Sequence, residues 1–256
     1  MTDTATVTLG ETPLARIGLG TNRLTHTPDN VAFIREAVAA GVSLIDTAHV
    51  YTGGESEDTI GAALSSPPAG CLVATKGGYG TGNGGPDVLG AQIEESLRRL
   101  RTDSIDLYYL HKPDPQTPLE ESLGVIAEYR DRGRIRYVGV SNVSVEQVER
   151  ARQVVSIAAV QNHYNLSERT HEDVVDHCAN NGIVFVPYFP LRGGGSVAAE
   201  IAKRHGATPE QVALAWLLRR SPATLAIPGT LSLDHLRENL ASAEIELTDD
   251  EFEALR

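Results

Sequence analysis

The chain has 256 residues, of which 41% are hydrophobic and 22% are charged, as is usual for a globular protein with a sizeable core. Its net charge is −12 and no segment concentrates Lys or Arg, which excludes a nucleic-acid-binding or anionic-membrane surface. No apolar run has the length of a membrane-spanning helix, and residues 1–8 lack the apolar stretch of a signal peptide. Cys71 and Cys178 lie far apart in apolar settings, which is typical of buried free thiols in a reducing compartment. We therefore expect a cytoplasmic protein without nucleic-acid or membrane partners.

Eight short runs rich in Val, Ile and Leu recur along the chain, and each is apolar on both faces, as in a parallel strand buried on two sides. They cover residues 17–20, 42–46, 71–76, 105–111, 135–141, 157–161, 183–188 and 225–228. Amphipathic helical patterns lie between and after them, over residues 29–40, 57–64, 87–100, 117–132, 144–154, 168–180, 209–219 and 232–241. Pro86 precedes one of these helices, and Gly41, Gly133 and Gly182 follow three others as C-terminal caps.

Strands that alternate with helices imply a parallel sheet with right-handed crossovers. Eight such units in a chain of this length favour a closed (β/α)8 barrel, the TIM barrel, although an open doubly wound sheet has the same pattern. Residues 7–9 and 14–16 flank the turn Gly10-Glu11-Thr12-Pro13 and predict an N-terminal β-hairpin. No linker divides the chain, so we expect residues 1–256 to form one domain.

The ends of the predicted strands carry the chemistry. In a barrel of this kind the active site lies at the carboxyl ends of the strands. Asp46, Lys76 and His111 each end a strand. Each alone has an ordinary explanation, as a helix cap, a solvated lysine or a satisfied core histidine. The other strands end in Gly20-Thr21, Ser141-Asn142, Gln161-Asn162, Tyr188 and Pro228-Gly229. So many polar or glycine residues on one face predict an active site there.

The motifs around these strand ends resemble those of the aldo-keto reductases. Residues 46–51 (Asp-Thr-Ala-His-Val-Tyr) and 54–57 (Gly-Glu-Ser-Glu) are similar to the family's D-T-A-x-x-Y and G-x-S-E segment, although Thr52 stands where the family commonly has Gly. Further motifs follow in the family's order at Lys76, His111, Gly139-Val140-Ser141-Asn142, Gln161-Asn162 and Ile227-Pro228-Gly229-Thr230. The resemblance covers about residues 15–242. It implies a barrel that reduces an aldehyde or ketone with NADPH.

Carbonyl reduction by hydride transfer leaves negative charge on the substrate oxygen, so the site needs a proton donor. The resemblance assigns the catalytic roles to Asp46, Tyr51, Lys76 and His111. Tyr51 is the general acid, Lys76 lies beside it, Asp46 holds Lys76, and His111 orients the carbonyl. Because a nearby ammonium favours a phenolate, we expect Lys76 to lower the pKa of Tyr51.

The resemblance also implies a cofactor site. Ser141, Asn142 and Gln161 would bind the nicotinamide carboxamide, and Tyr188 would stack on the ring. The glycine-rich run 192–196 suits an anion-binding nest of backbone amides, although its composition fits a flexible loop equally well. The residues assigned to the cofactor are Gly20, Thr21, Ser141, Asn142, Gln161, Tyr188, Phe189, Leu191, Gly193, Gly229, Thr230, Ser232, His235, Glu238 and Asn239.

The sequence departs from the family pattern at the positions that distinguish NADPH from NADH. A lysine and an arginine with which many members hold the 2′-phosphate of NADPH align with Gly229 and His235. Ser232, His235 and the amino end of the following helix would then bind the phosphate. We expect NADPH to be preferred over NADH only modestly.

Two other functions fit the same residues. A Schiff-base lyase would use Lys76 as its nucleophile, but Asp46 opposes this by keeping the ammonium charged. A regulatory barrel would bind the nicotinamide nucleotide with little turnover, and the intact Tyr51, Lys76 and His111 argue against it. The expected partner is a small carbonyl compound whose identity the sequence does not define, with a monomer as the default assembly.

Two motifs do not carry function. Residues 80–85 match G-x-G-x-x-G, but a Rossmann fingerprint begins directly after its strand, and here three residues separate the motif from Lys76. We interpret this run as a mobile loop at the barrel mouth. His163, His171 and His177 lack the spacing of a zinc site, so no metal is expected.

Overall fold

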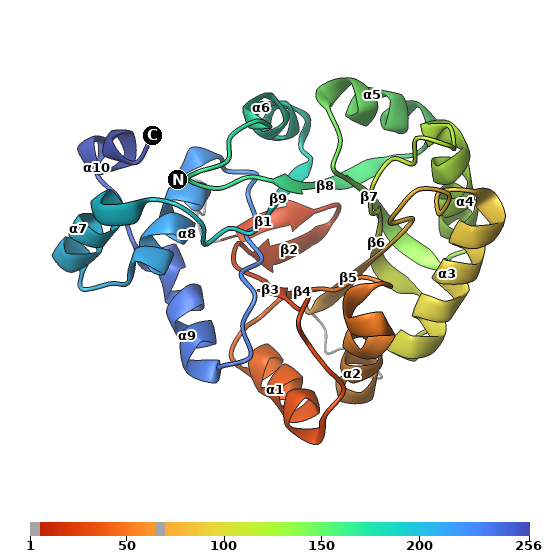
Figure 1. The fold of residues 1–256 in the computed structure, drawn as a ribbon, viewed down its shortest axis with the longest axis horizontal. Coiled ribbons are helices and arrows are strands. Elements are labelled where there is room, and N and C mark those ends of the chain that lie inside the picture. The colour runs from red at the N-terminus through yellow and green to blue at the C-terminus, as the bar shows by residue number, and fades with distance from the viewer. Residues whose placement is uncertain (1–5, 65–69) are drawn as a thin grey trace.

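The computed structural model describes residues 6–64 and 70–256. Within them, seven parallel strands form one sheet in chain order, with helices packed around its outer face (Figure 1). The strands are β3 (Leu19–Gly20), β4 (Leu44–Asp46), β5 (Leu72–Gly77), β6 (Ile105–Leu110), β7 (Ile135–Ser141), β8 (Ile157–His163) and β9 (Val184–Tyr188). The first seven predicted strands are confirmed, with small shifts at their ends.

The eighth predicted strand closes the sheet through isolated bridges and is not a regular strand. Residues 224–229 bridge both edge strands, because Leu225 N donates to Phe185 O at 2.9 Å and Gly20 N donates to Pro228 O at 3.1 Å. Pro228 has no amide hydrogen and cannot extend a ladder. Arg16 stabilises residues 218–224 next to this segment, because its guanidinium donates to Leu218 O at 2.7 Å and to Thr224 O at 3.0 Å. The sheet is therefore a closed (β/α)8-type barrel.

Ten α-helices and two short 3-10 helices, η1 and η2, occur in the described residues. They are α1 (Pro28–Ala39), η1 (Tyr51–Gly54), α2 (Glu55–Ala63), α3 (Pro86–Leu100), α4 (Leu119–Asp131), α5 (Val145–Val154), α6 (Glu172–Asn181), α7 (Gly195–His205), α8 (Pro209–Arg220), α9 (Leu233–Ala241), η2 (Ser242–Glu244) and α10 (Asp249–Ala254). Side-chain caps explain several of the starts: Ser144 and Thr208 each form a capping box with a glutamine three residues on.

Three helical assignments differ from the sequence predictions. Residues 195–205 form α7, which was not predicted because the glycines at 193–195 are typical of a loop. α10 was not predicted either. α6 begins at Glu172 and not at residue 168. The reason is that the Asn165 side chain accepts hydrogen bonds from the amides of Ser167 and Glu168 at 3.0 Å each, which folds this segment into a tight turn.

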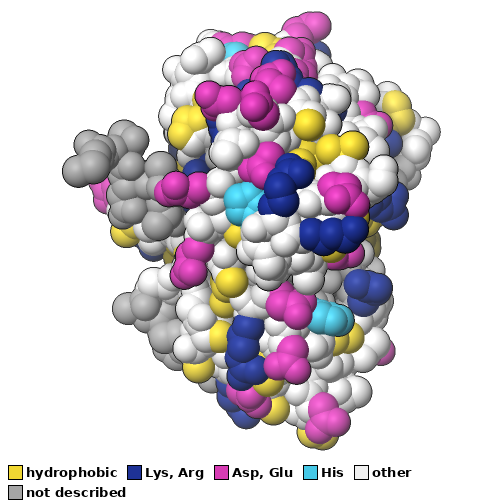
Figure 2. Space-filling view, turned by 90° about the vertical axis from the view of Figure 1, so that its left-hand side faces the viewer, with side chains coloured by type: hydrophobic (Ala, Val, Ile, Leu, Met, Phe, Trp, Pro, Cys, Tyr) yellow, Lys and Arg dark blue, Asp and Glu magenta, His cyan; other side chains and the backbone are white. Residues whose placement is uncertain are grey.

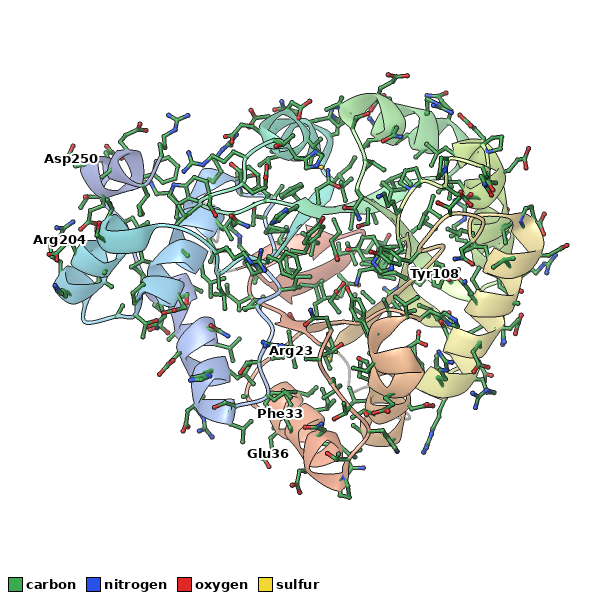
Figure 3. All side chains as sticks on the ribbon, viewed as in Figure 1. Arg23, Phe33, Glu36, Tyr108, Arg204 and Asp250 are labelled. Carbon is green, nitrogen blue, oxygen red and sulfur yellow. The ribbon has the colours of Figure 1, made fainter. Side chains whose placement is uncertain are left out.

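Two apolar layers build the core. The larger one lies between the sheet and the helices, whose inner faces are apolar. On α1, Phe33 points inward and Glu36 outward (Figure 3). The smaller one fills the barrel interior, and the predicted hairpin of β1 (Thr6–Leu9) and β2 (Thr12–Ala15) adds Leu9 and Leu14 to it. The hairpin thus covers the amino ends of the strands and leaves the carboxyl ends for the site.

The surface carries both signs of charge. On the face shown in Figure 2, acidic and basic side chains are intermixed. One such cluster joins α7 to α10, because Glu251 accepts hydrogen bonds from Arg204 at 3.0 Å and His205 at 2.9 Å. Cys71 and Cys178 are free and buried as predicted, and burial raises the pKa of both thiols to about 12. Among the helices of the described residues, none is long and apolar enough to cross a membrane.

Two helix glycines predict opposite effects on stability. A Cβ at Gly61 in α2 would lie 2.1 Å from Arg99 O of α3, whereas one at Gly124 in α4 would meet nothing within 4 Å. We expect Gly61→Ala to lower the free energy of unfolding by about 1–3 kcal/mol through overpacking. Gly124→Ala should raise it by roughly 0.5–1 kcal/mol, since alanine is the better helix former. Denaturant unfolding measures both, and equal effects of the two variants would contradict the close α2–α3 contact.

Candidate active site

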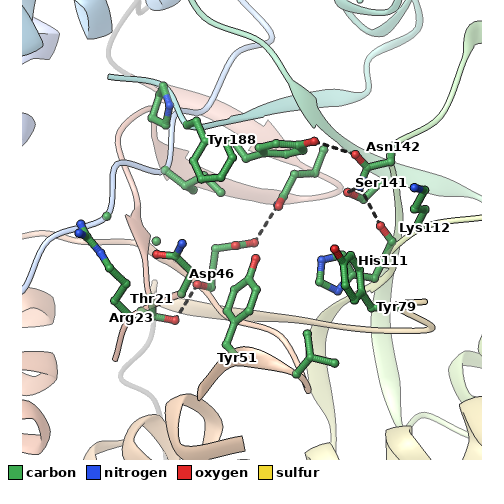
Figure 4. A pocket seen from close by; sticks show the side chains of 18 of the residues that line it. Thr21, Arg23, Asp46, Tyr51, Tyr79, His111, Lys112, Ser141, Asn142 and Tyr188 are labelled. Carbon is green, nitrogen blue, oxygen red and sulfur yellow. Dashed lines mark hydrogen bonds between the residues drawn. The ribbon is translucent and has the colours of Figure 1, made fainter. Parts of the chain in front are cut away.

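A cavity of about 830 Å³ opens at the carboxyl ends of the strands (Figure 4). All the residues that line it come from strand ends or the loops that follow them. They are Gly20, Thr21, Asn22, Arg23, Asp46, Val50, Tyr51, Tyr79, His111, Lys112, Ser141, Asn142, Gln161, Tyr188, Phe189, Pro190, Leu191, Arg192, Ile227 and Gly229. The cavity thus lies at the barrel face where the sequence predicts the site.

A buried ion pair lies beside the cavity, which Asp46 lines and Lys76 does not. Lys76 Nζ lies 2.6 Å from Asp46 Oδ1, and the two side chains are 0% and 3% exposed. Lys76 also donates to Thr47 O at 2.7 Å, and Gln161 Nε2 donates to Asp46 Oδ2 at 2.8 Å. Both charges are thus partnered by hydrogen bonds as well as by one another, which is the condition for keeping ions in an apolar interior.

Tyr51 is the side chain that this pair presents to the cavity. It begins η1, and Lys76 Nζ lies 3.4 Å from its hydroxyl and 4.9 Å from its ring centroid. Burial is the largest influence on Tyr51 and raises the pKa of its hydroxyl; Lys76 lowers that pKa, and Asp46 raises it again. The net pKa lies above the ordinary value. The expected lowering by Lys76 is therefore present but is outweighed by desolvation.

Lys76 remains an ammonium. Burial is the largest single influence and lowers its pKa. The charges of Asp46 and Tyr51 and the hydrogen bonds to both raise the pKa, and together they outweigh burial, so that the pKa lies above the ordinary value. A Schiff base needs a neutral amine. The pairing with Asp46 therefore opposes the lyase alternative.

His111 is neutral. It is 8% exposed, and burial, with a smaller contribution from Lys76, lowers its pKa to about 3. Its ring centroid lies 6.0 Å from that of Tyr51 and 4.7 Å from that of Tyr79. Its Nδ1 has no hydrogen-bond partner among the residues that the structure describes. A neutral imidazole carries one N–H donor and one acceptor, so it can donate a hydrogen bond to a carbonyl oxygen.

The opposite wall consists of amides and an aromatic ring. Tyr188 donates to Asn142 Oδ1 at 2.8 Å, and Asn142 Nδ2 donates to His111 O at 3.0 Å. The Tyr188 ring stacks on His163, with ring centroids 5.1 Å apart and an interplanar angle of 7°. Asn142 has a positive φ of 59°, a conformation that asparagine adopts more readily than most residues. With this backbone conformation the side-chain amide of Asn142 lies beside Ser141, and its Nδ2 donates to Ser141 Oγ at 3.1 Å.

Thr52, the departure from the family motif, has a positive φ of 49°. This explains why glycine is common there, because a β-branched residue is strained in the left-handed region. The Thr52 hydroxyl donates to Leu24 O at 2.8 Å, a contact that glycine cannot make. Thr52 thus ties the segment carrying Tyr51 to the loop after β3.

The predicted cofactor residues fall into two groups. Nine line the cavity: Gly20, Thr21, Ser141, Asn142, Gln161, Tyr188, Phe189, Leu191 and Gly229. Six do not. Gly193 packs against Leu166 and Ser167. The others, Thr230, Ser232, His235, Glu238 and Asn239, lie in the loop before α9 or in α9 itself, where Ser232 caps the helix and Asn239 is buried.

The predicted site residues do not include the lining residues Asn22, Arg23, Val50, Tyr79, Lys112 and Pro190. Asn22 and Arg23 follow Thr21 directly, so their place after a strand end was a usable signal. Figure 4 shows Arg23 and Lys112 on opposite sides of Asp46 and His111. Arg192 belongs to the glycine-rich run 192–196.

A barrel whose mouth holds an ion-paired lysine beside a phenol and a neutral histidine is suited to carbonyl reduction. Comparisons with known proteins identify the family: the Aldo/keto reductase family model matches residues 16–200 and 195–256. Pyridoxine 4-dehydrogenase of Escherichia coli is 36% identical over 98% of this chain and 96% of its own length, and an uncharacterized oxidoreductase of Schizosaccharomyces pombe is 35% identical over 98% and 88%. The chain belongs to the aldo/keto reductase family.

Solved structures agree. A thermostable aldo-keto reductase superposes with a TM-score of 0.89 at 36% identity, covering 98% of each chain. An aldo/keto reductase of Klebsiella pneumoniae superposes with a TM-score of 0.88 at 30% identity, covering 98% of this chain and 94% of its own. The barrel and its hairpin are thus those of an NAD(P)H-dependent oxidoreductase.

Removal of the ammonium tests the electrostatics of the site. In Lys76→Met the one influence that lowers the pKa of Tyr51 is lost and Asp46 remains, so Tyr51 should ionise at a higher pH than in the wild type. Ultraviolet difference spectra of tyrosinate, taken against Tyr51→Phe, isolate this group. In the double variant Asp46→Asn/Lys76→Met the midpoint of the Tyr51 titration should rise less, because the charge of Asp46, which raises the pKa of Tyr51, is also removed. An unchanged or lower midpoint in Lys76→Met would contradict the contact between the two groups.

Proposed function

We propose that Tyr51 is the general acid with which this enzyme reduces an aldehyde or ketone to an alcohol, using NADPH. The observation that carries the proposal is the buried Asp46–Lys76 pair with the Tyr51 hydroxyl 3.4 Å from Nζ. In support, two aldo/keto reductase structures from Klebsiella pneumoniae contain NADP with acetate and NADPH.

The residues present fit a nicotinamide nucleotide. Ser141, Asn142 and Gln161 offer amide and hydroxyl groups to a carboxamide, and Tyr188 offers a ring at the same wall. Arg23 and Arg192 line the cavity, and neither forms an ion pair within the described residues, which suits a diphosphate. Ser232 and His235 at the amino end of α9 are our candidates for the 2′-phosphate. The bound nucleotide supplies the hydride.

The proton comes from the protein. As negative charge develops on the carbonyl oxygen, Tyr51 donates its hydroxyl proton, and the resulting phenolate faces the ammonium of Lys76. Asp46 keeps that ammonium charged and in place. The neutral His111 donates a hydrogen bond that orients the carbonyl, and it stays neutral at neutral pH because its pKa is about 3.

Replacement of Tyr51 tests the proposal. Tyr51→Phe keeps the ring but removes the proton, so turnover should fall at least about 100-fold, the usual contribution of general acid catalysis. The dissociation constant of NADPH, measured by fluorescence or calorimetry, should change little because the wall of Asn142 and Tyr188 is intact. Retention of more than about a tenth of the turnover would exclude Tyr51 as the acid.

The cavity also indicates a substrate class. Lys112 lines it on the His111 side, opposite Arg23, and the Lys112 side chain forms neither a hydrogen bond nor an ion pair with any described residue. An unpaired cation beside a carbonyl site, in a chain of net charge −12, favours an anionic substrate. Tyr79, 52% exposed and packed on His111, adds an aromatic wall. We propose a planar or aromatic carbonyl compound that bears a carboxylate or phosphate.

A matched pair of substrates tests this assignment. Para-carboxybenzaldehyde and the methyl ester of the same acid differ in one negative charge. The ratio of their kcat/KM values should fall about tenfold in Lys112→Gln, since a hydrogen bond to a charged group is worth about 1.5–3 kcal/mol. Arg101→Gln removes an exposed cation at the far end of α3 and should leave the ratio unchanged. An equal loss with both substrates would rule out recognition of the anion.

We further propose that the protein acts as a monomer in a reducing compartment such as the cytoplasm. The two free, buried cysteines support the reducing compartment.

A further inference from the structure

A second buried ion pair lies behind the segment that carries Tyr51. The Glu57 side chain is 0% exposed, Arg99 is 15% exposed, and Glu57 Oε2 lies 3.4 Å from Arg99 Nη1. Thr75 donates its hydroxyl proton to Glu57 Oε1 at 2.6 Å. Neither Glu57 nor Arg99 lines the cavity. The pair therefore does not touch the space in which we place substrate and cofactor.

Arg99 reaches from α3 to the backbone just before Tyr51. Its Nη1 donates to His49 O at 3.1 Å, and its Nε lies 3.0 Å from Glu95 Oε1, which fixes the guanidinium on its own helix. The amide of His49 donates to Lys76 O at 2.9 Å. One peptide segment is thus held on one side by Arg99 and on the other by the backbone of the lysine that faces Tyr51.

The same guanidinium also packs on the residue that follows Tyr51 by three positions. A Cβ at Gly54 would lie 2.3 Å from Arg99 Cζ, and Gly54 has a φ of 100°, so glycine is required there for both space and conformation. Arg99 therefore contacts residues 49–54 near both ends, with Tyr51 between the two contacts. Glu57 holds the guanidinium from the start of α2.

We propose that Arg99 and Glu57 are positioning residues that hold the Tyr51 hydroxyl beside Lys76 Nζ. The inference rests on the role proposed for Tyr51. Its physical basis is that a misplacement of about 1 Å at a reacting group can cost about 100-fold in rate. A free arginine on a helix surface would have no such leverage, because solvated side chains do not define a backbone position.

The neighbouring residue Arg98 provides a matched control. Arg98 lies on the same helix and pairs with the same Glu95 at 2.6 Å, but its side chain is 66% exposed and no contact with residues 49–54 is found among the described residues. With NADPH and the methyl ester of para-carboxybenzaldehyde, we expect Arg99→Met to lower kcat about tenfold to 100-fold. Arg98→Met should leave kcat unchanged. The dissociation constant of NADPH should stay near the wild-type value in both variants.

Three further readouts separate positioning from a general loss of stability. Arg99→Lys retains one donor for His49 O and should recover part of kcat. The tyrosinate titration of Arg99→Met, taken against the Arg99→Met/Tyr51→Phe double variant, should move to higher pH because Tyr51 has moved away from Lys76. Should Arg99→Met not fold, Glu57→Gln, which keeps the hydrogen bond with Thr75, takes its place. A melting temperature lowered without loss of kcat would show a purely structural role.

Wild-type kcat and an unshifted tyrosinate titration in the folded variants Arg99→Met, Arg99→Lys and Glu57→Gln would overturn the inference. That result differs from failure of the proposed function, which would appear as substantial turnover in Tyr51→Phe. Loss of kcat in Arg99→Met, with partial recovery in Arg99→Lys and none in Arg98→Met, would support the positioning role.

Discussion

The ion pair between Lys76 and Asp46 is the interaction on which the site depends. Two charges are removed from water at the mouth of the barrel, and the cost is offset only because each has further partners, Thr47 O for the ammonium and Gln161 for the carboxylate. The pair then sets the state of its neighbours. Asp46 keeps Lys76 protonated. Lys76 in turn contributes to the neutrality of His111 and opposes the desolvation that raises the pKa of Tyr51.

The alternation of side chains along β5 links this pair to the outer layer. Successive residues of a strand point to opposite faces. Lys76 points into the barrel and meets Asp46, whereas Thr75 points outward and donates to Glu57 at 2.6 Å. One strand therefore fixes both ion pairs, and the segment carrying Tyr51 lies between them. The D-T-A-x-x-Y and G-x-S-E segments are thus joined in space: the first supplies the proposed acid, Tyr51, and the second supplies the glycine and glutamate behind it.

The barrel and the location of its site could be predicted from residues because strand runs and strand ends are local patterns. Lys76 and His111 were identifiable as the last residues of apolar runs, before any contact was known. Arg99 was not identifiable, because its role depends on the distance between α3 and residues 49–54, which no local pattern encodes. The helix at 195–205 was missed because three glycines mask its start. The net pKa shift of Tyr51 also depends on packing, since burial and not the neighbouring charge is its largest cause.

That shift bears on the direction of the reaction. A general acid for reduction must hold its proton at neutral pH, whereas the reverse oxidation of an alcohol needs the phenolate as a base. Burial keeps Tyr51 protonated, while Lys76 at 3.4 Å stabilises the phenolate only once the proton has been given up. The site is thus arranged so that the ammonium acts mainly on the state formed during proton transfer, which is where an interaction accelerates the chemical step. With Tyr51 in the proposed role, the raised pKa keeps its proton available for reduction at neutral pH.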